Sequence, residues 1–269
     1  MKLKMIIAAA IAAASSLVPA RADFTDTFAT LDPAWQVDRQ APAVFAPTVW
    51  NGGPALQLSI SNAGHNASSF YDTQGYQRSV NPLHQYSWSV SADLYVSSAM
   101  LNGTVPLSTE LWGSTGPGNG FYIFGLLSGA SSRSQAYAPT ASYSEQIWND
   151  LTATWTYVNA PLNADAYNRF SISHDGSGDA VSYSVNGSLV FVQLGMGGPL
   201  GDLYINDLER VYLQGYNFNG GDYTAYWSGL QAVTAAVPEP SAAALVGLGL
   251  GALAIAHRRR QPALAFARQ

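Results

Sequence analysis

The sequence has no cysteine, only two lysines, and few charged residues of either sign. Without cysteine, the chain has no disulfide, no thiolate nucleophile and no cysteine-ligated zinc or iron–sulfur centre. Charged residues make up 11% of the chain, less than half of the roughly 25% found in ordinary soluble domains. The 25 glycines, 15 tyrosines and 7 tryptophans argue against disorder. The composition therefore favours a compact extracellular domain with a largely uncharged surface.

The few basic residues gather at the two ends of the chain. Both lysines lie within the first four residues, and four of the ten arginines lie at residue 258 or beyond. The stretch from Asp23 to Glu239 holds all seventeen acidic residues against five arginines, a net charge of −12. A body of this charge is not suited to nucleic acid or an anionic membrane surface. Because it lacks lysine, it cannot carry out Schiff-base chemistry.

Residues 1–22 have the three parts of a secretory signal peptide. Two lysines lead into an apolar run, and the segment ends on a small-residue site of the A-x-A type formed by Ala20 and Ala22. This order predicts cleavage by signal peptidase before Asp23 and export of the remaining chain.

Residues 237–269 also have three parts. The motif Val237-Pro238-Glu239-Pro240-Ser241 comes first, an uncharged run at 242–256 follows, and the basic tail 257–269 carries Arg258, Arg259 and Arg260. A helix over the uncharged run spans about 22 Å, less than the roughly 30 Å of a bilayer core. It is therefore expected to be a marginal anchor, with the arginines on the cytoplasmic side.

This tripartite order resembles the PEP-CTERM sorting signal of Gram-negative bacteria. The resemblance implies transient anchoring in the inner membrane, after which an exosortase recognises the Pro-Glu-Pro element and removes the helix and basic tail. Nine residues, Gln261–Gln269, follow the arginine cluster, whereas tails of this family usually end sooner. The efficiency of processing therefore stays open. A plain C-terminal membrane anchor that is not cut is the alternative.

The body, residues 23–236, shows the period-two alternation of β-strands. The clearest strands are Tyr86–Val96, Leu151–Val158, and a hairpin in which Val181–Val185 turns at Asn186-Gly187 into Ser188–Leu194. Further strands are expected at Ala55–Ser61, Ser69–Asp72, Gly120–Leu127, Asn168–His174, Arg210–Gln214 and Tyr223–Thr234. Short glycine-rich turns separate them. The pattern predicts one all-β domain, a two-sheet antiparallel sandwich or jelly roll.

The order of these parts resembles the concanavalin A-like lectin/glucanase fold, which includes laminin-G-like domains. An opening segment at Phe24–Trp35, the hairpin at 181–190 and a closing strand at Asp222–Leu230 carry the resemblance. We expect four tryptophans in the core: Trp35, Trp88, Trp155 and Trp227. Glucanases of this fold place catalytic carboxylates on one strand as Glu-x-Asp-x-x-Glu, and related lyases use a Tyr-x-Lys strand. The body contains neither pattern, so the resemblance extends to the fold but not to a catalytic set.

Neither a metal site nor a cofactor is predicted. The histidines of the body, His65, His84 and His174, are dispersed and lack the spacing of a zinc site. Asp175 and Asp179 flank a Gly-Ser-Gly loop that could present oxygen atoms to Ca²⁺. Further acidic ligands are lacking there, and a plain β-turn is the favoured interpretation.

Aromatic side chains in or next to loops rich in glycine, serine and asparagine are the candidates for ligand binding. Such rings can stack on sugar faces while neighbouring amides and hydroxyls bind the sugar hydroxyls. The candidate glycan-binding residues are Trp112, Tyr122, Trp148 and Tyr226. The alternative is that these rings only cap the ends of the sandwich.

The sequence thus predicts a non-enzymatic exported protein that exosortase sorts to the cell surface or extracellular matrix, where it associates with polysaccharide. Two alternatives remain open. One is a glycan-active hydrolase or lyase with an unrecognised site, and the other is a purely structural matrix protein. The sequence does not specify the sugar, the oligomeric state or the biological process.

Overall fold

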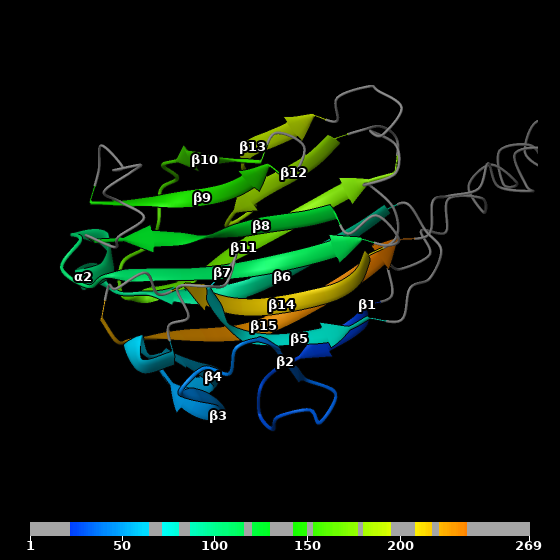
Figure 1. Ribbon diagram of the computed structural model, residues 1–269. Coiled ribbons are helices and arrows are strands. Elements are labelled where there is room, and N and C mark those ends of the chain that lie inside the picture. The colour runs from blue at the N-terminus through cyan, green and yellow to red at the C-terminus, as the bar shows by residue number, and fades with distance from the viewer. Residues whose placement is uncertain are drawn as a thin grey trace, which may run out of the picture. The chain divides into compact units, whose positions relative to one another are not determined.

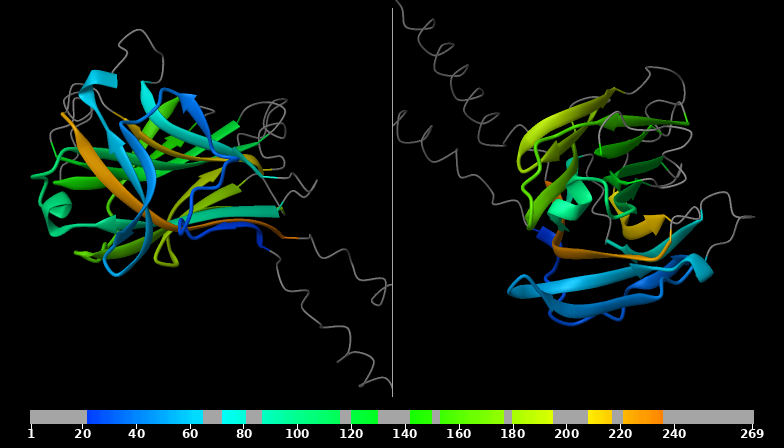
Figure 2. Two further views of the ribbon diagram at one scale, coloured as in Figure 1. Left: turned by 90° about the horizontal axis from the view of Figure 1, so that it is seen from below. Right: turned by 90° about the vertical axis from the view of Figure 1, so that its left-hand side faces the viewer.

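The computed structural model describes residues 22–64, 72–80, 87–115, 120–129, 142–149, 153–176, 180–194, 208–216 and 221–235. Most of the signal peptide and all of the C-terminal tail, including the helices expected there, lie outside these residues. The described chain forms two antiparallel sheets packed as two layers (Figure 1). Figure 2 shows the same layers from two other sides. The predicted all-β sandwich is therefore confirmed.

The first sheet has eight strands. Seven run in the order β13-β12-β11-β6-β15-β4-β3, and β1 also pairs with β15. The strands are β1 (Ala22–Asp26), β3 (Val44–Trp50), β4 (Gly53–Ile60), β6 (Ser87–Val96), β11 (Ala166–Asp175), β12 (Ala180–Val185), β13 (Ser188–Leu194) and β15 (Tyr223–Ala235). The last strand of the chain therefore lies inside this sheet, between β6 and β4.

The second sheet has seven strands in the order β10-β9-β8-β7-β14-β5-β2. They are β2 (Gln36–Arg39), β5 (Thr73–Ser79), β7 (Leu107–Thr115), β8 (Gly120–Ser128), β9 (Tyr143–Asn149), β10 (Thr154–Val158) and β14 (Leu208–Tyr216). The helical elements of the described chain are the 3-10 turn η1 (Asn62–Gly64) and the one-turn helix α2 (Ser98–Leu101). No helix in this part of the protein is long and apolar enough to cross a membrane.

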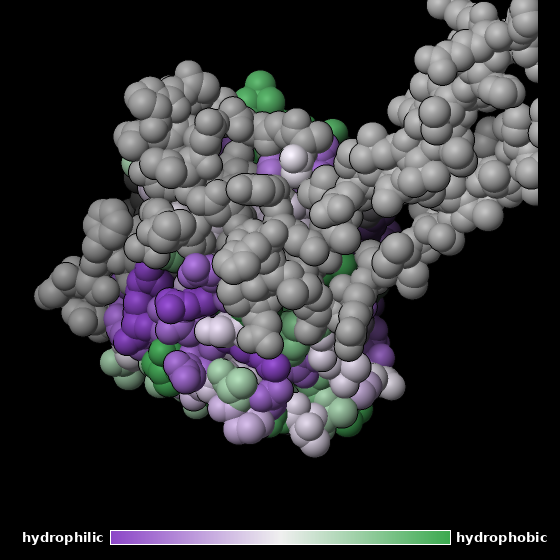
Figure 3. All heavy atoms as spheres, turned by 90° about the vertical axis from the view of Figure 1, so that its right-hand side faces the viewer, coloured by the Kyte–Doolittle hydropathy of each residue, from purple (hydrophilic) through white to green (hydrophobic). Residues whose placement is uncertain are grey.

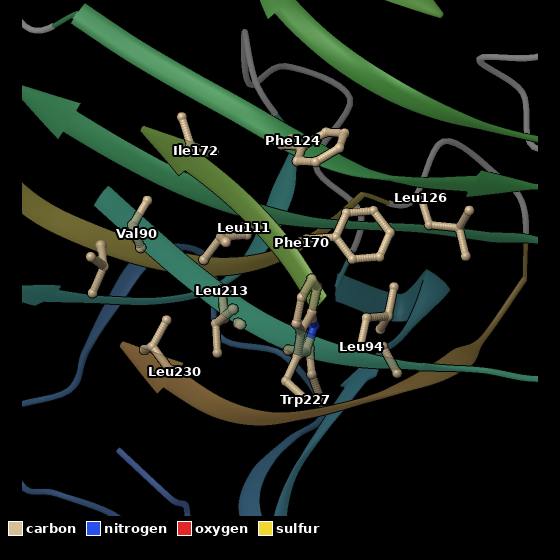
Figure 4. Close-up of a cluster of buried hydrophobic side chains, with 14 of the residues drawn as sticks. Val90, Leu94, Leu111, Phe124, Leu126, Phe170, Ile172, Leu213, Trp227 and Leu230 are labelled. Carbon is tan, nitrogen blue, oxygen red and sulfur yellow. The ribbon is translucent and has the colours of Figure 1, made fainter. Parts of the chain in front are cut away.

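The hydrophobic core fills the space between the two sheets. Leu94 and Trp227 enter it from the first sheet and Leu111 and Phe124 from the second, and all four are fully buried (Figure 4). The indole Nε1 of Trp227 donates to Oγ1 of Thr109 at 3.0 Å and so joins the sheets across the core. Burial of large side chains of this kind stabilises by roughly 1.5–3 kcal/mol each.

Three of the four tryptophans expected in the core lie there: Trp35, Trp88 and Trp227. Trp155 does not. It is half-buried on the outward face of the second sheet, in a second apolar cluster. Trp155 and Thr156 on β10 point to opposite faces of the sheet, as expected from the alternation. It is Thr156, however, that faces the core, since it pairs with the core residue Ile147. Both faces of this sheet carry apolar side chains, so alternation alone does not show which face meets the core.

The hairpin expected at Asn186-Gly187 is present. It joins β12 to β13, and its two turn residues have φ angles of 50° and 78°. Positive φ at both central positions is the geometry of a type I′ turn, which Asn-Gly favours. The strand expected at Ser69–Asp72 is not observed with these bounds. The observed strand β5 begins at Thr73, and most of the expected range lies outside the described residues.

Candidate functional site

The outward face of the second sheet carries two neighbouring rows of directly opposed residues. We call them the polar row and the aromatic row. The polar row consists of Tyr157, Gln146, Gly125, Glu110, Gln214, Gly75 and Asp38, from β10 to β2. The aromatic row consists of Trp155, Trp148, Ile123, Trp112, Tyr212, Gln77 and Gln36, in the same strand order. Leu111 and Phe124 point into the core, so their strand neighbours in both rows point away from it.

Glu110 lies at the centre of the polar row and is fully buried. Its Oε1 accepts a hydrogen bond from Nε2 of Gln146 at 2.7 Å, and its Oε2 accepts one from Nε1 of Trp112 at 2.8 Å. The same Gln146 nitrogen also lies 2.9 Å from Oγ of Ser108. Both carboxylate oxygens thus accept hydrogen bonds, which fix the orientation of the carboxylate.

Two glycines make room for the side chains of this row. A Cβ atom on Gly125 would lie 2.2 Å from the carbonyl oxygen of Thr109 and 2.8 Å from Cγ of Glu110. A Cβ atom on Gly75 would similarly lie 2.7 Å from Oε1 of Gln214. Any larger residue at either position would displace the strand backbone or the polar side chains beside it.

Gln214 lies opposite Glu110 in the polar row and bonds to Asp38 at the far end of the row. Its Nε2 donates to Oδ2 of Asp38 at 2.6 Å, and Asp38 also forms an ion pair with Arg39. The Oε1 of Gln214 is buried and has no hydrogen-bond partner among the residues that the structure describes. A buried acceptor without a donor costs free energy.

The aromatic row runs from buried rings to half-buried ones. Trp112 and Tyr212 are almost fully buried, with ring centroids 5.6 Å apart, and the guanidinium of Arg39 lies 5.2 Å from the Trp112 ring centroid. Trp148 and Trp155, whose centroids are 5.2 Å apart, are half-buried. The rings of this row that a ligand can reach are therefore those at the end formed by β9 and β10.

The four aromatic residues proposed from the sequence do not form one site. Trp112 and Trp148 share the aromatic row, although Trp112 lies within a strand and not in a loop. Tyr122 is 3% exposed and belongs to the core between the sheets, where a ligand does not reach it. Tyr226 lies on the first sheet, where its ring stacks on Trp50 at 3.8 Å with an interplanar angle of 6°.

The sequence analysis missed the polar residues of the site: Glu110, Gln146 and Gln214. A signal was present in β7, where Ser108, Glu110, Trp112 and Ser114 alternate with residues that face the core. All nine residues of this strand are buried. Because both faces are covered, the strand does not show the simple contrast between polar and apolar residues.

Among the described residues, the carboxylates of this region are not arranged as a hydrolytic pair. Glu145 precedes Gln146 and therefore lies on the opposite face of the sheet, where burial raises its pKa to about 7. Asp38 shares the face of Glu110 but is three strands away, a separation of about 14 Å at ordinary strand spacing. Gln214 lies between the two. Glycoside hydrolysis by paired carboxylates needs a separation of roughly 5–10 Å.

The described residues contain no group of three or more histidine, aspartate or glutamate side chains that could hold a metal ion. Asp175 lies at the end of β11. Asp179, the other residue considered for Ca²⁺, lies outside the described residues, as do Ala20, the Pro-Glu-Pro element and the arginine cluster.

Comparison with protein families identifies the C-terminal segment. Residues 236–261 match the PEP-CTERM protein-sorting motif. The chain carries a PEP-CTERM sorting signal. This signal shows that the protein is exported and is anchored in the membrane before sorting. A search of the curated proteins gave no match to the sequence.

Several solved structures resemble the chain in fold. The Crh5 transglycosylase in its apo form has a TM-score of 0.50 and 14% identity, over 81% of this chain and 86% of its own. The cellulose induced protein Cip1 has a TM-score of 0.51 and 12% identity, over 80% and 98% of the two chains. A glycoside hydrolase family 16 protein from Bacteroides ovatus has a TM-score of 0.49 and 12% identity, over 78% and 99%. The likenesses to the first two show a concanavalin-like β-sandwich and nothing beyond the fold.

Proposed function

We propose that the exported protein binds a neutral polysaccharide on the outward face of its second sheet and does not cleave it. The observation that carries the proposal is the pairing of the two rows. Half-buried Trp148 and Trp155 offer ring surface for stacking, and half-buried Tyr157, at the same end of the polar row, adds a ring and a hydroxyl beside them. Sites for small molecules typically combine aromatic walls with a few placed polar groups in this way.

The charge of the body supports a neutral or cationic ligand over an anionic one. The stretch from Asp23 to Glu239 has a net charge of −12, which repels anionic polymers and leaves neutral ones unaffected. A carbohydrate ligand is also supported by one of the structural neighbours, the Crh5 transglycosylase in complex with NAG, at a TM-score of 0.50 and 15% identity.

Binding without turnover follows from the carboxylates. Glu110 accepts two hydrogen bonds and is held as an acceptor, whereas Glu145 faces the core and Asp38 is three strands away. A paired acid and base would be needed to protonate a leaving group and activate a nucleophile. The alternative is a glycan-active enzyme, since structural neighbours include a transglycosylase and glycoside hydrolases.

The route of export also supports the proposal. A protein released from the inner membrane by exosortase reaches the cell surface or extracellular matrix, where polysaccharide is at hand. Weak affinity at each site suits display in many copies, because multivalency raises the effective strength of attachment.

Titration calorimetry of the exported protein against neutral glucans, galactans and chitosan tests the proposal. We expect weak binding to at least one polymer and an affinity about tenfold lower for Trp148→Ala, equivalent to about 1.4 kcal/mol. Trp50→Ala is the matched control, because it removes the same ring from the opposite sheet and should leave the affinity unchanged. A parallel reducing-sugar assay should detect no release. Release that Glu110→Gln abolishes would establish an enzyme, and no binding to any polymer would leave a structural role.

A further inference from the structure

Strand β13 forms one edge of the first sheet and carries neither a charge nor a proline, although its register with β12 shifts between Tyr183 and Ser184. Within the described part of the chain it pairs only with β12. Its seven residues, SLVFVQL, include no charged residue and no proline. Exposed edge strands offer unpaired backbone groups to other strands, and proteins usually block them with charges, proline or short length.

The other edge strands are short or carry a charge or a proline. In the first sheet, β3 contains Pro47, and β1, which pairs only with β15 among the described strands, has five residues and carries Asp23 and Asp26. In the second sheet, β2 has only four residues and carries Asp38 and Arg39, while β10 has five residues. Strand β13 is therefore the edge strand with seven residues and neither a charge nor a proline.

Strand β13 also presents apolar side chains to solvent. Leu189, Val192 and Leu194 are 63%, 37% and 69% exposed, and they are three of the six exposed large hydrophobic residues in the described chain. Leu189 and Val192 oppose Ser184 and Ser182 of β12, so they lie on the outward face of the sheet. We call these three residues the β13 stripe. Figure 3 shows hydrophobic side chains at the upper end of the molecule, the height at which Figure 1 places β13.

The distribution of charge favours a second copy of the same chain as the partner. Strands β12 and β13 contain no charged residue, although the stretch from Asp23 to Glu239 has a net charge of −12. Two copies would repel each other over most of their surfaces and least at this edge. An antiparallel strand is also complementary to itself, because each copy supplies both donors and acceptors to the other.

We propose that β13 pairs antiparallel with β13 of a second copy, so that two eight-stranded sheets join into one continuous sheet. The β13 stripes of both copies then meet on the same face and are shielded from water. The pairing is isologous, and one contact uses the free β13 edge of each copy. The assembly therefore closes as a dimer. The proposal does not depend on glycan binding.

Sedimentation analysis of the exported protein tests the proposal. We expect a mass twice that of one processed chain, with a dissociation constant raised at least about tenfold by Val192→Lys and by Leu194→Lys. Val49→Lys is the matched control. Val49 is 75% exposed on β3, the opposite edge of the same sheet, and its replacement should leave the dimer intact. Circular dichroism should show that all three variants keep the β-sheet spectrum.

Cysteine cross-linking gives a second measurement, which does not depend on weakening the dimer. Because the chain has no cysteine, a single introduced thiol can form a disulfide only with another copy. Val192→Cys or a neighbouring substitution on the β13 stripe should give an oxidised dimer, and Val49→Cys should not. Three results would overturn the proposal. They are a protein that stays monomeric at all concentrations, a dimer whose dissociation constant neither lysine variant changes, and an open-ended polymer.

Discussion

Trp112 and Glu110, two residues apart on β7, are joined by a hydrogen bond of 2.8 Å from the indole Nε1 to the carboxylate Oε2. This bond connects the aromatic row to the polar row. The orientation of the central carboxylate therefore depends on a ring that is itself almost fully buried.

Trp112→Phe tests this connection, because it keeps an aromatic ring but removes the donor. We expect a loss of about 1–3 kcal/mol in the free energy of unfolding, since a buried carboxylate oxygen loses its partner. Glycan affinity should fall with it. Urea unfolding and calorimetry measure the two effects. Trp148→Phe, at a half-buried position, is the control, and equal destabilisation by both variants would contradict the assigned role of the bond.

Glu145 should make the stability of the protein depend on pH. Burial raises the pKa of this carboxyl from 4.5 to about 7, although the backbone N–H of Ala160 donates to it at 2.8 Å. The folded state thus binds this proton more tightly than the unfolded state. The contribution of Glu145 to stability is complete below pH 4.5 and is lost as the pH rises towards 7. At about 1.4 kcal/mol for each pH unit, the loss is about 3 kcal/mol.

Glu145→Gln should remove this loss. We expect the variant to match the wild type near pH 4 and to be more stable at pH 8, in urea unfolding followed at both values. Glu209→Gln, on β14, is the matched control for the removal of one carboxylate. A wild-type protein more stable at pH 8 than Glu145→Gln would show that the carboxylate has a partner that compensates its burial.

Gly125→Ala should disturb both the fold and the site. The added Cβ atom would approach the Thr109 carbonyl oxygen to 2.2 Å, and overpacking of this kind costs about 1–3 kcal/mol. Gly53→Ala is the control, because a Cβ atom there meets nothing within 4 Å. Its effect should stay within about 0.5 kcal/mol. Chemical unfolding of the two variants measures their free energies of unfolding. Similar values would contradict the prediction and would mean that the strands separate easily at Gly125.

Processing should trim the chain at both ends. We expect signal peptidase to cut before Asp23, and exosortase to cut at or near Pro238-Glu239-Pro240 in a host that has this enzyme. Mass spectrometry of the exported protein should then find neither residues 1–22 nor the arginine cluster at 258–260. Intact arginines in the mature protein would indicate the plain-anchor alternative.

The sequence predicted the sandwich because several strands show one apolar face, as Tyr86–Val96 does in β6. It missed β7 and β9, which are buried on both faces and so lack a clear alternation. It also missed β3, where Pro47 reads as a break but is tolerated at a sheet edge.

The candidate site was only partly predictable for a related reason. Trp112 and Trp148 were predicted as candidates and lie in the aromatic row, but nothing local indicated that Tyr122 enters the core or that Tyr226 lies on the other sheet. Two neighbours of Glu110 in the polar row, Gln146 on β9 and Gln214 on β14, lie about 36 and 104 residues further along the chain. Contacts over such distances depend on strand order, which no local pattern specifies.

The place of β15 has a consequence for the export of this chain. This strand, the last of the described residues, pairs with β6 and β4 inside the first sheet, and Val233 near its end pairs with Ala22 at the beginning of β1. The earlier strands of the sheet therefore lack a neighbour until β15 has been synthesised, and pairing over such a sequence separation is slow. A chain that crosses a membrane from its N-terminus cannot complete this sheet until β15 has also crossed. We therefore expect the first sheet to form only after most of the chain has been translocated.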